Sequence, residues 1–415
     1  MTRKRILMIA FHFPPLQGSS GIQRTLGFAR YLPEFGWEPE ILTVRPDVYD
    51  AIAQASVTPD GLVVHRTHAI DAARAFAVRD RYPSFLAQPD RWSSWRWTAI
   101  PKALSLVRRI KPHVLWSTYP IATAHAIAHA IARLTGIRWV ADFRDPMAQD
   151  GYPVDKRTWE SFRRVESRTV ARAHRSVFTT AGAARMYQAR YPERRERIGV
   201  IENGYDEEMF EGLRPTSPPG TRQCTLLLHS GIVYPSERDP SALFAALRTL
   251  MERGIAVPGR FILRLRAAVH DSFIRGVAER SGVLDLIELA PALPYREALA
   301  EMIDADGLVV LQAANCNEQI PAKLYEYLRA GRPILGLADP AGDTADALRR
   351  AGITHIAALE NAESIATTLS DFLDAIATKR VPALSHRDIA NASRRARTRE
   401  LAAALEAVAQ EDAGD

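Results

Sequence analysis

The chain alternates between short apolar runs and longer segments in which apolar residues recur about every three or four positions. This alternation of strand and helix patterns predicts parallel sheets with helices on both faces. Each crossover is long enough for a right-handed connection. In the first half the predicted strands are 5–11, 40–44, 62–65, 113–117, 139–142, 176–180 and 198–201, and the main predicted helices are 23–35, 101–110, 121–135 and 159–173.

The alternation restarts after residues 213–220, a segment rich in Pro, Ser and Gly that is typical of a linker. A chain of 415 residues also suits two domains of roughly 200 residues each. We therefore expect domains at 1–212 and 221–386, with an Ala/Arg/Glu-rich helix at 387–410 packing back on the first. The second half predicts strands at 225–229, 261–265, 284–289, 307–311, 333–337 and 354–356, and helices at 240–253, 271–280, 295–304, 321–330 and 344–351.

Composition and charge are those of a globular protein, with 47% hydrophobic and 25% charged residues. The net charge of +6 favours an anionic partner, although a solvated basic surface explains it equally well. The sequence has no zinc-finger spacing and no RNA-recognition motif, so no nucleic-acid partner is expected. Cys224 and Cys316 are expected to be reduced core thiols.

The basic N-terminus leads into a short apolar run that ends at His12, with no small-residue cleavage pattern after it. We interpret this run as a buried strand. No apolar stretch approaches the ~20 residues of a membrane span. A cytoplasmic location is expected.

The most informative segment, residues 318–333, follows the predicted strand 307–311. Pro321 suits the first turn of a helix, and Gly331 suits the position just past its end. The helix N-terminus favours an anion, Lys323 adds a positive charge, and Glu326 and Glu318 can accept hydrogen bonds from hydroxyl groups. The alternative is a surface helix with a Lys–Glu pair three residues apart.

A second loop, residues 229–240, follows the strand 225–229 and opens a helix. Arg238 in this loop can neutralise a phosphate as a leaving group forms. With Lys323 it would make a two-cation clamp on a diphosphate, close to Gly231. Alternatively, Arg238 is a surface residue at a helix start.

Two further loops follow strands of the first half. In one, Gly18 and Gly21 allow the backbone to approach a ligand, although a plain strand–helix turn fits as well. In the other, Asp145 can orient a hydroxyl group or take up its proton. Asp142 and Arg144, in the same segment, either line this site or simply pair with each other. His12 is a rival for contact with the ligand.

Other polar clusters have simpler explanations. Asp304-Ala305-Asp306 resembles a metal-binding Asp-x-Asp but sits at a helix end before a strand, so no metal is expected. Asn203-Gly204 is a turn signal. The segment 85–102 combines aromatic and basic residues that either dock on anionic lipid or pack under a long loop. These residues are Trp92, Trp95, Trp97, Arg91, Arg96 and Lys102.

The segment 318–333 resembles the signature of retaining GT-B glycosyltransferases of the family 4 type. Those enzymes carry two glutamates separated by seven residues and then Gly-x-Pro, as in Glu318, Glu326 and Gly331-Arg332-Pro333 here. The Pro-x-Lys-x-x-Glu-Tyr pattern at 321–327 looks like the branch that builds surface polysaccharides. The chain departs from the family by lacking a Gly-rich turn after Glu318 and the Gly-Arg pair at 231–232.

The resemblance implies an α/β GT-B fold of two Rossmann-like domains whose parallel sheets face an interdomain cleft. It implies metal-independent hexosyl transfer, without a cofactor, from a nucleotide diphosphate sugar co-substrate to a glycan, glycolipid or small-molecule acceptor. We add peripheral contact with the inner face of the membrane. The first domain would bind the acceptor and the second the donor, with Glu326 on the ribose and Glu318 on the sugar. The candidate catalytic residues are Asp145, His12, Arg238 and Lys323; the donor-binding residues are Gly18, Gly21, Gly231, Arg238, Glu318, Ile320, Lys323, Leu324 and Glu326; and the acceptor-side residues are Asp142, Arg144 and Asp145.

Two alternatives share this fold. A sugar-nucleotide 2-epimerase would bind the same donor and act on it alone. A non-catalytic GT-B subunit would only bind a partner protein, and the missing Gly-Arg cation keeps this alternative open.

Overall fold

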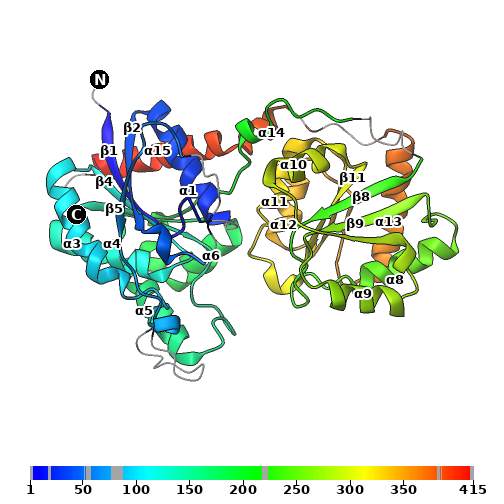
Figure 1. Cartoon of the computed structure of the whole chain (residues 1–415), viewed down its shortest axis with the longest axis horizontal. Coiled ribbons are helices and arrows are strands. Elements are labelled where there is room, and N and C mark those ends of the chain that lie inside the picture. The colour runs from blue at the N-terminus through cyan, green and yellow to red at the C-terminus, as the bar shows by residue number, and fades with distance from the viewer. Residues whose placement is uncertain are drawn as a thin grey trace. The chain divides into compact units, whose positions relative to one another are not determined.

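The computed structural model describes residues 3–16, 20–50, 52, 58–75, 87–216, 223–380, 384 and 386–411. The chain divides into two compact units, each with its own sheet and core (Figure 1). The first unit is Met1–Asn203 with Arg394–Asp415, and the second is Gly204–Ser393.

The first unit is built on a seven-stranded parallel sheet. Its strands are β1 (Lys4–Ile9), β2 (Trp37–Val44), β3 (Val63–Thr67), β4 (Val114–Thr118), β5 (Arg138–Arg144), β6 (Arg175–Phe178) and β7 (Ile198–Val200). Its helices are α1 (Ser20–Tyr31), α2 (Ala72–Ala75), α3 (Trp95–Ile110), α4 (Ala122–Thr135), α5 (Lys156–Arg172), α6 (Ala181–Arg190) and α15 (Arg394–Gln410). The strand order is β3-β2-β1-β4-β5-β6-β7.

The apolar residues of the central strand β1 are buried on both faces of the sheet. Successive side chains point to opposite faces, and helices cover each face. Leu7 and Ile9 pack into a core with α3, α4, α5 and α6. Ile6 and Met8 pack into a second core with α1 and α15. The C-terminal helix α15 therefore completes the first unit and lies along α1 (Figure 1).

The second unit repeats this design with six parallel strands. Its strands are β8 (Thr225–Ser230), β9 (Phe261–Arg266), β10 (Ile287–Ala290), β11 (Gly307–Gln312), β12 (Ile334–Ala338) and β13 (Ile356–Ala357). Its helices are α7 (Glu207–Phe210), α8 (Ser241–Glu252), α9 (Asp271–Arg280), α10 (Tyr295–Asp304), α11 (Lys323–Ala330), α12 (Asp343–Arg350), α13 (Ala362–Ala377) and α14 (His386–Asn391). One face packs against α8, α9 and α13, and the other against α10, α11 and α12.

The strand order of each sheet reverses direction once, and this switch point marks where a ligand is expected to bind. The first reverses between β1 and β4, and the second, with order β10-β9-β8-β11-β12-β13, reverses between β8 and β11. Open α/β sheets bind ligands outside the carboxyl ends of the strands at such a switch point. The loops that follow β1, β4, β8 and β11 are therefore the first places to look for chemistry.

The predicted strands are confirmed, with ends that shift by a few residues. The helices at 271–280 and 295–304 are also confirmed as predicted. Other helix starts differ from the prediction. The helix predicted from Pro101 begins at Trp95 and runs through the proline, and α11 begins at Lys323, two residues after Pro321. The helices predicted at 23–35 and 159–173 each begin three residues earlier.

Helices α6 and α13 were not predicted, nor were the short helices α2 and α7. A single helix was predicted at 387–410, where the structure has α14 and α15. The boundary between units falls at Asn203, because Tyr205 and Phe210 already pack into the core of the second unit. Part of the Pro/Ser/Gly-rich segment, 217–220, lies outside the described residues.

Candidate functional site

In the second unit, the switch point carries a buried histidine at the end of β8. His229 is fully buried, and its Nδ1 lies 2.9 Å from the Val309 carbonyl oxygen on β11. A carbonyl oxygen only accepts hydrogen bonds, so Nδ1 carries the proton and donates it. The other ring nitrogen, Nε2, is then an acceptor, and it lies 3.1 Å from the Lys323 amine. Burial, and next the charge of Lys323, hold the pKa of His229 well below its ordinary value, so the ring stays neutral.

Lys323 begins α11, and its amine lies against the loop that follows β8. A Cβ built on Gly231 would come within 2.7 Å of Lys323 Nζ, so the glycine leaves room for this close approach. Gly231 also has φ +119°, a conformation that other residues rarely adopt. Burial, and then the charge of Arg238, lower the pKa of Lys323 well below its ordinary value, while Glu326 opposes the shift.

Arg238 lies in the loop after β8 and is the second basic residue of this site. Its Nη1 donates to the Ile232 carbonyl oxygen at 2.8 Å, and its guanidinium lies 5.4 Å from the centre of the Tyr234 ring. Its Nε is buried without a hydrogen-bond partner among the described residues. Within that same part of the chain, neither Arg238 nor Lys323 forms an ion pair with a carboxylate.

Two other arginines of this unit, Arg264 and Arg266, are neutralised by carboxylates. Arg266 donates two hydrogen bonds to Glu301, and Arg264 contacts both Glu301 and Glu288. By contrast, neither Arg238 nor Lys323 has a carboxylate ion-pair partner among the described residues at the switch point. A buried basic group without such a partner is costly to hold in its charged form and suits an anionic ligand.

Helix α11 is fixed by a hydrogen bond to β8 and by a glycine cap at its C-terminal end. The buried Tyr327 hydroxyl accepts a hydrogen bond of 2.8 Å from the Ser230 amide at the end of β8. Gly331 ends the helix in a left-handed conformation with φ +67°, as predicted, and its amide donates to the Tyr327 carbonyl oxygen. Because Tyr327 joins α11 to β8, it fixes Lys323 relative to His229.

The remaining donor-site candidates are two partly buried glutamates and two apolar residues of the core. Glu326 is partly buried and accepts a hydrogen bond of 2.6 Å from the Tyr295 hydroxyl on α10. Glu318 is partly buried in the loop before α11. Ile320 and Leu324 point into the hydrophobic core, and the Leu324 amide already donates to Pro321. Among these four residues, only the two glutamates present polar side chains for a ligand.

In the first unit, Asp142 pairs with Arg24 on α1, a partner that was not predicted. Arg24 donates two hydrogen bonds of 2.9 Å to the two carboxylate oxygens of Asp142, which is fully buried. Arg24 also donates to the carbonyl oxygens of Ile201 and Glu202. This buried ion pair therefore ties α1 to β5 and to the last residues of the first unit, and Asp142 has a structural role.

Arg144 has a strained backbone that redirects the chain at the end of β5. Its φ is +61°, and the register with β6 shifts between Asp142 and Arg144. Such bulges re-aim side chains, and left-handed non-glycine residues gather at functional sites. The Arg144 carbonyl oxygen accepts hydrogen bonds from the Thr179 amide and hydroxyl, which stabilise this conformation.

At the bulge, Arg144 lies close enough to His12, which follows β1, for its charge to act on the His12 ring. Burial lowers the pKa of His12 to about 4, and the charge of Arg144 adds to the effect. Burial raises the pKa of Asp145, opposed by Arg144. The Asp145 carboxylate makes no hydrogen bond with any described residue, so it can accept one from a ligand. Gly21 is buried in the first turn of α1, and Gly18 lies outside the described residues.

The structure gives the other polar and aromatic clusters structural roles. Asp304 accepts hydrogen bonds from the Thr216 amide and hydroxyl, and Asp306 accepts one from the Leu226 amide. No group of metal-binding side chains occurs in the described residues. Of the three tryptophans, Trp92 and Trp95 are core residues, whereas Trp97 is 78% exposed. Both cysteines are free thiols.

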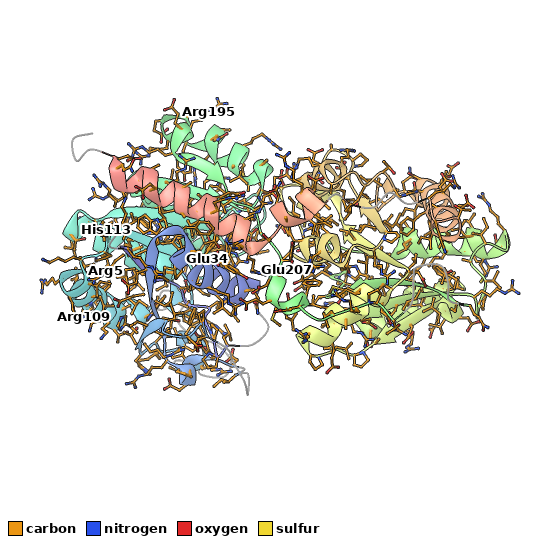
Figure 2. All side chains as sticks on the ribbon, turned by 90° about the horizontal axis from the view of Figure 1, so that it is seen from above. Arg5, Glu34, Arg109, His113, Arg195 and Glu207 are labelled. Atoms are coloured by element: carbon orange, nitrogen blue, oxygen red, sulfur yellow. The ribbon has the colours of Figure 1, made fainter. Side chains whose placement is uncertain are left out.

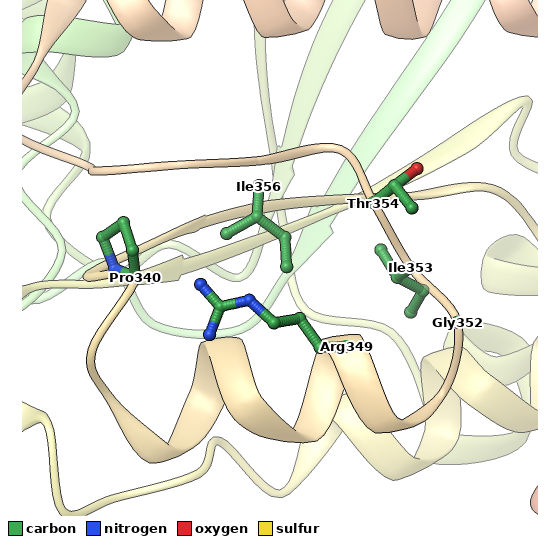
Figure 3. A pocket seen from close by; sticks show the side chains of 6 residues that line it. All are labelled: Pro340, Arg349, Gly352, Ile353, Thr354 and Ile356. Carbon is green, nitrogen blue, oxygen red and sulfur yellow. The ribbon is translucent and has the colours of Figure 1, made fainter.

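A surface pocket lies elsewhere in the second unit and shares no residue with the candidate sites. It is formed around the end of α12 and the loop that leads to β13, with Arg349 extended beneath Ile356 (Figure 3). Arg349 also pairs with Asp346 on the same helix. The lining residues are Pro340, Arg349, Gly352, Ile353, Thr354 and Ile356.

Some charged side chains that lie apart from these sites are exposed. Arg109 and Arg195 project from the surface of the first unit (Figure 2). Glu34 forms an exposed ion pair with Arg395. Arg109 and Arg195 are thus solvated, in contrast to the partly buried Arg238 and Lys323.

Comparison with known proteins bears on the fold and on the first unit. Residues 20–204 match the family model described as a glycosyl transferase 4-like domain. No curated protein matches the chain at a significant level. In the described residues, no helix is long and apolar enough to cross a membrane.

Solved structures resemble the chain over nearly its whole length. A glycosyltransferase from Rickettsia africae has a TM-score of 0.65 at 11% identity, covering 99% of this chain and 100% of that one. The UDP-forming trehalose-phosphate synthase from Burkholderia xenovorans, solved with glucose-6-phosphate, has a TM-score of 0.66 at 15% identity, covering 97% and 100%. HepE from Anabaena, solved with UDP-glucose, has a TM-score of 0.57 at 10% identity, covering 98% and 97%. At these identities the likeness shows a shared fold.

Proposed function

We propose that this chain, which has the GT-B fold and carries a glycosyl transferase 4-like domain over residues 20–204, is a retaining glycosyltransferase. In this proposal it transfers a hexosyl group from a nucleotide diphosphate sugar to an acceptor hydroxyl in surface polysaccharide or glycolipid synthesis. It needs no metal ion and no other cofactor. The proposal rests on one observation above all, the two basic side chains Arg238 and Lys323, which have no carboxylate ion-pair partner among the described residues of the second unit.

Arg238 and Lys323 suit the diphosphate of the donor. Arg238 lies in the loop after β8 and Lys323 at the start of α11, and neither pairs with a carboxylate in the described residues. A diphosphate would supply the missing counter-charge, and its negative charge grows as the bond to the sugar breaks. Preorganised cations stabilise such developing charge, which supports roles for both residues in the chemical step.

The two glutamates suit the hydroxyl groups of the donor. Glu326 is oriented by the Tyr295 hydroxyl at 2.6 Å and lies one turn along α11 from Lys323. We assign it to the ribose. Glu318 lies in the loop before the helix, and we assign it to the transferred sugar.

The acceptor is assigned to the first unit, at Asp145. Its carboxylate makes no hydrogen bond with the described residues, and the charge of the neighbouring Arg144 opposes the rise in its pKa that burial causes. In the proposed reaction Asp145 orients the acceptor hydroxyl. The bond from sugar C1 to the diphosphate oxygen breaks, the bond from C1 to the acceptor oxygen forms on the same face, and the hydroxyl proton passes to the departing diphosphate.

Activity with defined sugars tests this proposal. UDP-glucose is the first donor to use, because an Anabaena protein of the same fold was solved in complex with it. Release of UDP and a product with unchanged anomeric configuration, seen by NMR only when an acceptor is added, would support transfer. An epimerised sugar formed without an acceptor would replace the proposal with the epimerase, and no binding of any nucleotide would favour the non-catalytic subunit.

We also propose peripheral contact with the inner face of the membrane. Helix α3 has no acidic residue, carries Lys102 and Arg108 on its outer side, and exposes Trp97. A basic helix with an exposed aromatic side chain suits an anionic lipid surface. Co-sedimentation with anionic but not with neutral vesicles, lost in Trp97→Ala, is the expected result. Equal binding to both vesicle types would contradict it.

A further inference from the structure

A buried carboxylate in the first unit holds together the segment that follows Asp145. Glu166 on α5 is fully buried, and it accepts hydrogen bonds from the hydroxyl groups of Tyr187 and Tyr191. Arg190 donates to it at 2.9 Å, and Arg163 donates to it as well. A buried charge is tolerated only with such a complete set of partners.

Three hydrogen bonds connect this cluster to residues 147–148, immediately after the bulge. The Met147 amide donates to the Tyr187 hydroxyl at 2.9 Å, and the Ala148 amide donates to Glu166 at 3.2 Å. The Ala148 carbonyl oxygen accepts a hydrogen bond of 2.8 Å from Arg190. The backbone two and three residues beyond Asp145 is therefore fixed by side chains of α5 and α6.

Tyr187 holds the segment on both sides of Asp145. Its ring packs 5.3 Å from the ring of Phe143, two residues before Asp145, and 4.4 Å from the ring of Phe178. Its hydroxyl binds Met147, two residues after Asp145. Tyr187 is itself fully buried, so its position is set by the core.

We propose that Tyr187, oriented by Glu166, is a positioning residue that holds Asp145 in place for the acceptor. The proposal rests on the proposed function, because it assigns Tyr187 an effect on transfer through Asp145. The proposal gives Tyr187, a residue of the first unit, no role in donor binding. Loss of the Tyr187 hydroxyl should therefore slow transfer and leave donor binding unchanged.

A matched pair of variants separates positioning from stability. Tyr187→Phe removes a hydroxyl that binds both Glu166 and Met147, whereas Tyr191→Phe removes one that binds Glu166 and Arg163. Both variants delete one oxygen atom and one hydrogen bond to the same carboxylate. Only the first releases the segment after Asp145.

Two measurements on the full chain give the test. Hydrogen exchange of the peptide spanning residues 145–149 should rise in Tyr187→Phe and stay at the wild-type level in Tyr191→Phe. In transfer assays, kcat should fall at least about tenfold in Tyr187→Phe, since small misplacements of reacting groups are costly, with an unchanged UDP Kd. Equal exchange and equal kcat in the two variants would overturn the proposal.

Asp145→Asn distinguishes this proposal from the proposed function. If that variant transfers sugar like the wild type, the assignment of Asp145 to the acceptor fails, whatever the exchange data show. If it is impaired while Tyr187→Phe has normal exchange and normal kcat, Asp145 keeps its role and the positioning by Tyr187 fails.

Discussion

Lys323 Nζ donates a hydrogen bond to His229 Nε2 over 3.1 Å, and the opposite ring nitrogen of His229 donates to Val309 on the neighbouring strand. These two hydrogen bonds orient the Lys323 amine relative to β8 and β11, the two central strands of the sheet. The lysine reaches the switch point beside Arg238 and, in the described residues, without a carboxylate ion-pair partner. Its protonation should therefore respond strongly to an anionic ligand.

The first prediction concerns pH. Burial and Arg238 lower the pKa of Lys323 in the free protein, and a bound diphosphate would raise it again because it favours the ammonium form. Binding of UDP should therefore take up protons, and its affinity should fall as the pH rises through the lowered pKa of the free protein. Calorimetry in two buffers of different ionisation enthalpy measures this uptake.

Lys323→Met provides the control, because it removes the titrating group and keeps an apolar stem of similar length. This variant should bind UDP more weakly and without proton uptake. If the wild type shows no uptake, or if the variant keeps it, Lys323 is not the group that responds to the ligand.

The second prediction concerns Gly231. In Gly231→Ala the new Cβ would lie 2.7 Å from Lys323 Nζ, so the amine must move away from the loop. We expect UDP affinity to fall about tenfold, on the order of 1.4 kcal/mol. Isothermal titration of the purified variant measures the change.

Gly259→Ala is the matched control for backbone strain. Gly259 also has a positive φ, of +80°, but nothing lies within 4 Å of its added Cβ. Both variants should lose some stability, and only Gly231→Ala should lose affinity. Parallel losses of affinity in the two would show that strain, and not the position of Lys323, is responsible.

The third prediction concerns the ion pair between Arg24 and Asp142. Arg24→Met leaves the fully buried Asp142 carboxylate without its cation, which should lower the free energy of unfolding of the first unit by about 3–5 kcal/mol. Urea denaturation measures this loss. Arg395→Met, which removes the exposed pair with Glu34, should cost less than about 1 kcal/mol. Similar small losses in both variants would contradict the structural role of Arg24.

Much of the fold could be predicted because each strand is a short apolar run between polar segments. The sequence also predicted the end of α11, since Gly331 is suited to a left-handed cap. Helix α6 was missed because its alanine-rich sequence, residues 181–190, gives little contrast between its faces. Helix α3 begins at Trp95, and its interior Pro101 was mistaken for its first turn.

Parts of the candidate sites could not be predicted because they depend on contacts between distant residues. Arg24 and Asp142 are 118 positions apart in the sequence. Asp142 and Arg144 lie two positions apart on one strand, and the shift in register between them could not be predicted from the sequence. Tyr187 and Tyr295 belong to helices that carry no motif, and only the folded chain brings them to Met147 and Glu326.

Titration with nucleotides tests the central claim most directly. UDP, GDP and other nucleoside diphosphates should be titrated against the wild type, Lys323→Ala, Arg238→Ala and the control Arg248→Ala, whose arginine pairs with Glu252 on the surface of α8. We predict that at least one nucleotide binds the wild type and the control alike. Each site variant should weaken that binding roughly ten- to hundredfold, as expected for the loss of one charged hydrogen-bond donor. Unchanged affinity in both site variants, or no binding of any nucleotide to the wild type, would contradict the account.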